Sequence, residues 1–84
     1  MDALLLALSD HNRRTILNQL SAGPSEVSEL AALLPIARPG VSRHLRVLRE
    51  VGLVQVRKDA QRRIYSLKPD PLIELDDWLG KYRG

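Results

Sequence analysis

The stretch from Pro35 to Val54, PIARPGVSRHLRVLREVGLV, limits the possible folds of this chain more than any other part of it. Apolar residues recur in it at the spacing of one helix face, namely Val41, Leu45 and Leu48, with Val47 and Val51 beside them. Pro39 suits the first helical turn, where its missing N–H costs little, and Gly52 suits the position after the last turn. We therefore predict a helix from about Arg38 to Val51 that packs one face against a core.

The opposite face of this predicted helix is strongly basic. It carries a hydroxyl and four guanidinium groups, from Arg38, Ser42, Arg43, Arg46 and Arg49, and Glu50 is the only acid in the helix. Such a helix fits the major groove of DNA, where arginine pairs bidentately with guanine. A charged face that is merely solvated is the other interpretation, and the helix alone does not decide between them.

The charges of the whole chain favour the first interpretation. Between Arg38 and Arg63 there are eight basic and two acidic residues, a local balance of +6. The net charge of the 84 residues is only +3, so the remainder of the chain carries −3. This asymmetry is typical of nucleic-acid binders, because neutralising phosphates and releasing counterions supplies much of their affinity.

The segments before the basic helix predict further helices. Ala3 to Leu8 is a short apolar helix, and Asp10 can cap a second one that runs to about Ala22. In PSEVSELAALLP, Ser25 or Ser28 can cap a third helix, which Pro35 stops. A tight turn then leads into the basic helix. This is helix-turn-helix order, in which the second helix enters the groove.

After Gly52 the pattern changes to a period of two. Leu53–Lys58 and Arg63–Leu67 alternate apolar and polar residues, and Asp59–Arg62 joins them, which predicts a β-hairpin. Three basic residues at its tip suit contact with a phosphate backbone or the minor groove: Lys58, Arg62 and Arg63. A last amphipathic helix follows. The sequence thus predicts one mainly α domain over residues 1–84, with about five helices and a two-stranded wing.

Cysteine content and hydropathy restrict the class of protein. The chain has no cysteine, so it has neither disulfides nor thiolate ligands, and no apolar run is long enough to span a bilayer. We expect a cytoplasmic protein with no membrane contact. The sequence has no nucleophile–base pair, no paired carboxylates and no phosphate-binding glycine loop. We therefore expect that the protein is not an enzyme and binds no cofactor.

At this point the chain resembles a known family. The segments ALSDHNRRTIL, VSELAALLP, VSRHLRVLREVGLV and RRIYSL are similar to those of the ArsR family of bacterial winged-helix repressors, over about Ala3 to Arg83. The ending LIELDDWLGKYR resembles a branch without a recognisable metal site. The resemblance implies a homodimer that binds an inverted repeat in a promoter, usually as a repressor. It places the base-reading positions on Arg38, Pro39, Ser42 and Arg43.

The sequence departs from the family pattern at several positions. Ala37 stands where a serine often begins the recognition helix, and Ala60 stands where the wing turn commonly has glycine. Glu26 and Ser28 occupy the positions of a cysteine pair that binds metal in some members. The last helix has three acids but no histidine, so we expect no metal site.

The first and last helices, over about residues 2–8 and 71–83, are the expected dimer interface. Their leucines and aromatic residues exceed what a small monomer covers easily. The candidate interface residues are Leu4, Leu5, Leu8, Leu72, Leu75, Trp78, Leu79 and Tyr82.

The main interpretation is a DNA-binding repressor that needs no ligand. Two other functions remain open. A winged helix also serves as a protein–protein module, although the local balance of +6 argues for an anionic partner. A repressor that is released by an unidentified organic effector is the second alternative. His11 and His44 are expected to be packed and hydrogen-bonded, with a phosphate contact as the other possibility for His44.

Overall fold

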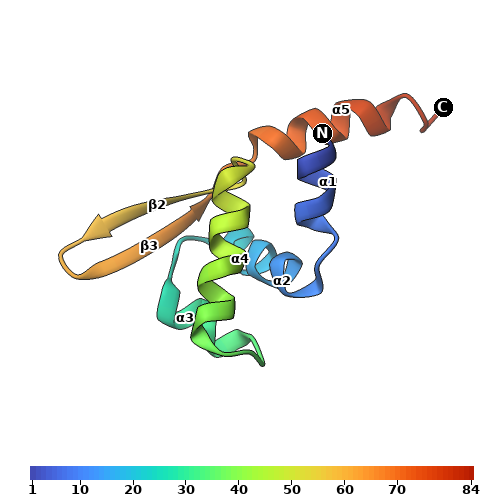
Figure 1. Cartoon of the computed structure of the whole chain (residues 1–84). Coiled ribbons are helices and arrows are strands. Elements are labelled where there is room, and N and C mark those ends of the chain that lie inside the picture. Colours follow the sequence, from blue (N-terminus) through green and yellow to red (C-terminus); the bar gives the residue numbers. More distant parts are fainter.

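The computed structural model describes all 84 residues and contains five helices and three strands (Figure 1). In chain order these are α1 (Asp2–Leu8), α2 (His11–Ala22), β1 (Ser25–Glu26), α3 (Val27–Leu33), α4 (Arg38–Glu50), β2 (Val54–Asp59), β3 (Arg62–Leu67) and α5 (Asp70–Gly80). The winged helix-turn-helix class that the sequence predicts is confirmed, with α3 and α4 as the helix-turn-helix pair.

The ends of α2 and α4 follow from the residues that flank them. The carboxylate of Asp10 caps α2 by accepting from the backbone N–H groups of Asn12 at 2.8 Å and Arg13 at 3.1 Å. After α4, Gly52 adopts a φ of 79°, a left-handed conformation that glycine adopts without a steric penalty. Both signals were readable in the sequence, and the helix boundaries agree with them.

The cap of α3 differs from the prediction, which gave this role to Ser25 or Ser28. Glu26 is the N-cap, and it forms a capping box with Glu29. The Glu29 carboxylate accepts from the backbone N–H of Glu26 at 2.8 Å. Ser25 is instead buried and belongs to β1, so its side chain is not at the helix end.

The predicted two-stranded wing is present, and a short third strand, β1, joins it in one sheet. Its order is β1-β3-β2, all antiparallel, and Ser25 pairs with Tyr65 at the short edge strand β1. In the hairpin Asp59 pairs with Arg62, so the turn contains only two residues, Ala60 and Gln61. Ala60 has a φ of 57°, in the left-handed region where a side chain costs energy.

A single hydrophobic core joins the helices to the base of the sheet. The predicted stripe of α4 is confirmed, because Val41, Leu45 and Leu48 are fully buried. The other members of the core are Leu4, Ala7, Ile16, Leu17, Leu20, Leu30, Leu34, Leu53, Val54 and Tyr65. Burying such side chains is worth about 1.5–3 kcal/mol each, which fixes the orientation of α4 on the domain.

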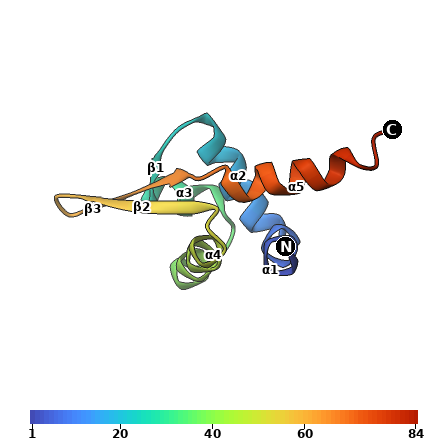
Figure 2. The same ribbon diagram turned by 90° about the horizontal axis from the view of Figure 1, so that it is seen from above.

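The molecule is elongated, with extents of 47 × 24 × 21 Å. The hairpin projects at one end and α5 projects from the body at the other, as both views show (Figures 1 and 2). Helix α5 has no buried residue, and Leu72 and Leu75 make its contact with the core. The predicted last helix reached residue 83, whereas α5 ends at Gly80. No helix has both the length and the apolar composition needed to cross a membrane.

Candidate nucleic-acid interface

Helix α4 presents its basic face to solvent. The buried stripe lies on one side of the helix, so the residues on the other side point away from the core. All five residues of α4 that the sequence proposes for DNA contact are exposed: Arg38, Pro39, Ser42, Arg43 and Arg46. Arg49 is exposed as well. The geometry therefore gives a convex helix with a row of cations on its outer surface.

The guanidinium groups of this row have no partner within the protein. The arginines that make side-chain hydrogen bonds or ion pairs are others, namely Arg13, Arg14, Arg62 and Arg83. Arg38, Arg43, Arg46 and Arg49 take part in none of them. Four like charges on one short helix repel one another, and nothing in the fold neutralises them. An anionic partner would relieve that repulsion.

The first turn of α4 begins without a side-chain cap. Ala37 is the N-cap residue, with a φ of −68° and a ψ of 154°, and its methyl group accepts no hydrogen bond. Only the backbone closes the turn, through Gly40 N–H to the Ala37 carbonyl at 2.9 Å. Pro39 has no N–H and the Gly40 N–H is already bonded, so an anion at this end of the helix would meet the positive end of the dipole and the exposed Arg38 side chain.

The wing adds two cations on one face of the hairpin. Lys58 and Arg63 lie directly opposite each other, two residues beyond the pair Val56 and Tyr65. Side chains alternate between the faces of a strand, so Lys58 and Arg63 share the face on which Tyr65 enters the core. Like charges in directly opposed positions destabilise a hairpin. Their pairing here is consistent with a surface that binds phosphate.

Arg62 lies on the opposite face of the hairpin and already has a partner. Its Nε donates to the carboxylate of Glu26, in the capping box of α3. The same carboxylate accepts from the Ser28 hydroxyl at 3.3 Å. The pair ties the wing to the start of the helix-turn-helix. Sequence reasoning missed it because 36 residues separate the partners, and the contact of Arg62 with DNA stays a prediction.

His44 is packed and hydrogen-bonded, as predicted. Arg13 Nη1 donates to its Nδ1 at 3.2 Å, and since a guanidinium only donates, the proton of the neutral ring is on Nε2. That nitrogen lies 3.9 Å from Asp10 Oδ1. Arg13 also donates to the carbonyls of Ala7 at 2.7 Å and Leu6 at 3.1 Å. Arg13 thus joins α1 to α4.

The expected dimer surface needs one correction. Leu4 is only 5% exposed and belongs to the core, because it is on the side of α1 that faces the body of the domain. Leu8, Leu72 and Leu75 are partly buried against the core. The large apolar side chains that remain exposed on α1 and around α5 are Leu5, Leu6, Ile73, Trp78, Leu79 and Tyr82.

Two of these exposed residues were not among the candidates. Leu6 is 69% exposed and Ile73 is 56% exposed. Every residue from Ala3 to Leu8 is apolar, so no period separates an inner from an outer face of α1. Tyr82 lies beyond the end of α5, with its ring edge-on to Trp78 at 5.1 Å between centroids. The aromatic pair extends the apolar surface of the helix.

No group of three or more His, Asp or Glu side chains lies close enough together to hold a metal ion. The acids of α5 are dispersed along an exposed surface, and Asp76 accepts from Arg83 Nη2 at 2.9 Å. The exposed cations of α4 and the wing offer a surface for binding anions.

Comparison with known proteins agrees with this geometry. The family described as "Bacterial regulatory protein, arsR family" matches residues 10–56. The HTH-type transcriptional regulator Rv2034 of Mycobacterium tuberculosis is 45% identical over 76 residues, which are 90% of this chain and 71% of that protein. The transcriptional repressor SdpR of Bacillus subtilis is 29% identical over 94% of this chain and 88% of its own length.

A solved structure has the same fold over nearly the whole chain. The crystal structure of the ArsR family transcriptional regulator RHA00566 superposes with a TM-score of 0.90 at 30% identity. The match covers 98% of this chain and 84% of that one. The relatives are transcriptional regulators and not enzymes. This chain therefore belongs to the ArsR family of bacterial regulatory proteins and is a DNA-binding transcriptional regulator.

Proposed function

We propose that the protein is a homodimeric repressor that binds an inverted repeat in double-stranded DNA. Helix α4 enters the major groove, where Arg38, Ser42 and Arg43 contact base edges and Pro39 packs against a base without a hydrogen bond. Lys58 and Arg63 hold the backbone beside it. The observation that carries this proposal is the row of exposed guanidinium groups on α4 without partners in the protein.

The dimer is supported by the exposed apolar residues of α1 and α5. Trp78 and Leu79 are 38% and 43% exposed, and they lie on a helix that projects from the body. Burying several such side chains gains about 1.5–3 kcal/mol each, enough to offset an association cost of about 4–15 kcal/mol. A two-fold axis between two copies would present two α4 helices to successive major grooves.

Repression is the regulatory sense that we propose. The relative SdpR is named a transcriptional repressor, and a dimer seated across a promoter excludes polymerase by occupying its site. We place the protein in the cytoplasm, where bacterial DNA is located. No metal or cofactor is part of the proposal.

Selection of bound duplexes from a random-sequence library tests this function. The expected result is an enriched inverted repeat whose half-sites are centred about one helical turn, 10–10.5 base pairs, apart or a multiple of that. Electrophoretic titration of the enriched duplex should then give one complex with two chains. Failure to enrich any sequence, at low and at moderate salt, would contradict the proposal and favour a protein–protein module.

A further inference from the structure

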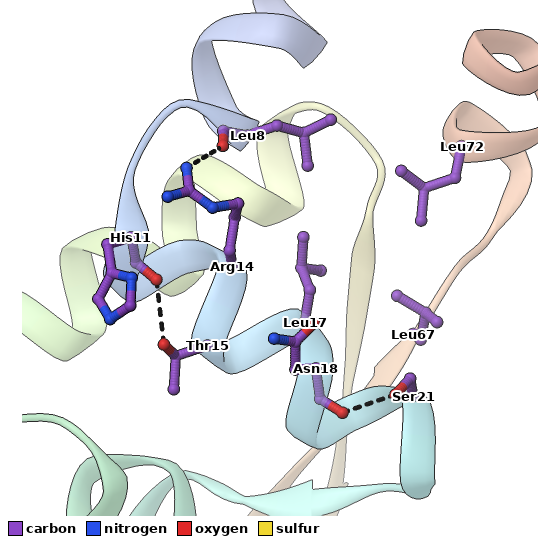
Figure 3. Close-up of a pocket in the computed structure, with 9 residues that line it drawn as sticks. All are labelled: Leu8, His11, Arg14, Thr15, Leu17, Asn18, Ser21, Leu67 and Leu72. Carbon is purple, nitrogen blue, oxygen red and sulfur yellow. Dashed lines mark hydrogen bonds between the residues drawn. The ribbon is translucent and has the colours of Figure 1, made fainter. Parts of the chain in front are cut away.

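A pocket of about 540 Å³ lies outside the DNA-binding surface, between α2, the end of β3 and the start of α5 (Figure 3). Its apolar wall is made of leucines from four different elements: Leu8, Leu17, Leu67 and Leu72. In the close-up their side chains point toward the same space. The volume is within the range of about 300–1,000 Å³ that is usual for small-molecule sites.

The polar side of the pocket is formed by side chains of α2, namely His11, Arg14, Thr15, Asn18 and Ser21. Arg14 and Asn18 are one helical turn apart on its exposed face. Arg14 Nη1 donates to the Leu8 carbonyl at 2.8 Å, which leaves Nε and Nη2 free, and the Asn18 side-chain amide makes no hydrogen bond. The hydroxyls of Thr15 and Ser21 donate to carbonyls of their own helix.

The permanent charge in the pocket lining is of one sign only. Arg14 is the one permanent charge in it, and no Asp or Glu lines the pocket. A cationic ligand would therefore find no counter-ion, whereas an anionic group would gain charge-assisted hydrogen bonds from the guanidinium. A ligand with one anionic group and an apolar body satisfies both sides of the pocket.

We propose that this pocket binds a small organic carboxylate with an apolar tail. The carboxylate accepts from the free nitrogens of Arg14 and from the Asn18 amide, and the tail covers Leu17, Leu67 and Leu72. Such a ligand buries leucine surface that is otherwise exposed to water.

A ligand in this pocket can influence DNA binding because the pocket adjoins α5. This part of the proposal rests on the proposed function. Leu72 is in the first turn of α5, whose contact with the core otherwise depends on Leu75. A ligand held between Leu72 and α2 stabilises one orientation of α5. Since α5 is the proposed dimer helix, that orientation sets the separation of the two α4 helices.

Octanoate is the probe that tests the pocket without DNA. We would titrate it, below its micelle-forming concentration, into the isotope-labelled full chain and record amide NMR shifts. The expected result is saturable binding with shifts at α2, the end of β3 and the start of α5. Octanol and octylamine, which have the same tail, should bind at least about tenfold more weakly, because the charge-assisted hydrogen bonds are absent. Equal binding of all three probes, or none, would overturn the proposal.

Three variants and one control assign the binding to named groups. Arg14→Gln should weaken octanoate about tenfold, while Arg14→Lys should keep most of the affinity through its charge. Asn18→Trp should block the pocket from an exposed helix position that tolerates a larger side chain. Arg49→Gln removes the same charge from α4, outside the pocket, and should leave octanoate binding unchanged. Thermal unfolding shows whether each variant is folded, and unchanged binding in folded Arg14→Gln and Asn18→Trp would overturn the assignment.

A DNA titration with and without octanoate separates the two proposals. A change in DNA affinity that disappears in Asn18→Trp supports regulation through the pocket. Octanoate binding with an unchanged DNA affinity overturns only the regulatory part. Absence of DNA binding in both titrations overturns the proposed function and leaves the pocket result intact.

Discussion

Asp10 lies at a point where three helices meet. It caps α2, lies near the His44 ring of α4, and is next to Arg13, which holds the end of α1. The backbone N–H of Arg13 is the main cause that lowers the pKa of Asp10, and His44 and the Asn12 N–H act in the same direction. Partial burial opposes them. The net effect keeps this carboxyl ionised to a lower pH than usual.

The lowered pKa makes part of the stability dependent on pH. A carboxyl with a depressed folded-state pKa stabilises the fold fully above its ordinary value, here 3.8, and loses this contribution as the pH falls through its folded-state pKa. Asp10→Asn keeps an acceptor for the cap but removes the charge. We expect it to be less stable than the parent at neutral pH, with the gap closing below pH 3.8.

Urea unfolding of both proteins over a pH series measures this effect. Asp10→Ala, which also loses the cap, should cost about 1 kcal/mol at neutral pH. A gap between Asp10→Asn and the parent that stays constant through the acid range would show that the charge of Asp10 has no part in it.

The ion pair of Glu26 and Arg62 neutralises one cation of the wing within the protein. Glu26→Gln keeps an oxygen for the α3 cap but removes the charge that holds the guanidinium. If Arg62 then reaches a phosphate, affinity for random duplex should rise. The slope of log affinity against log salt should become steeper by about 0.9 per chain, since each phosphate contact contributes about that much.

Glu74→Gln is the matched control, because it removes the same charge from α5, away from α4 and the wing. Equal salt slopes for the parent, Glu26→Gln and Glu74→Gln would show that Arg62 serves only to anchor the wing. Fluorescence anisotropy with one labelled duplex gives all three slopes.

At the scale of the elements, helix α4 begins without a side-chain cap. Ala37 already has the extended backbone conformation of an N-cap, but it has no side-chain acceptor. Ala37→Ser would offer its hydroxyl oxygen to the Gly40 N–H, and we expect a gain of about 0.5–1 kcal/mol in the free energy of unfolding. Chemical denaturation measures it. No gain would mean that the backbone bond from Gly40 to Ala37 already satisfies this turn.

The elements that the sequence predicted well are those with explicit local signals. Asp10 and Gly52 mark a start and an end, and the spacing of Val41, Leu45 and Leu48 identifies the inner face of α4. The wrong predictions concern elements in which such local signals are absent or compete with one another. Two serines near α3 suggested a cap that Glu26 provides, and the apolar α1 has no period that assigns Leu4 to the core.

At the scale of the whole molecule, two features of the candidate site depend on long-range contacts. The Glu26–Arg62 pair requires β1 to lie beside β3, and the contact of Arg13 with His44 requires α2 to pack against α4. Neither is encoded in a local pattern. The exposed arginines of α4 were predictable, because a helix with one buried stripe has only one outer face.

The exposed apolar surface of α1 and α5 predicts association. Sedimentation at micromolar concentration should show a dimer, and Leu79→Glu should convert it to a monomer by placing a charge on that surface. Leu33→Glu changes an equally exposed leucine on α3 and should leave the dimer intact. A parent protein that sediments only as a monomer would contradict the proposed interface.

The most direct test of DNA reading by α4 compares Arg43→Ala with Arg63→Ala on the selected duplex and on random duplex across a salt series. Arg43 is on the outer face of α4, and Arg63 is on the wing. We predict that Arg43→Ala costs about 1–3 kcal/mol on the selected duplex and much less on random duplex. Arg63→Ala should weaken both alike and reduce the salt slope by about 0.9 per chain. Equal weakening of both duplexes by Arg43→Ala would contradict base reading by α4.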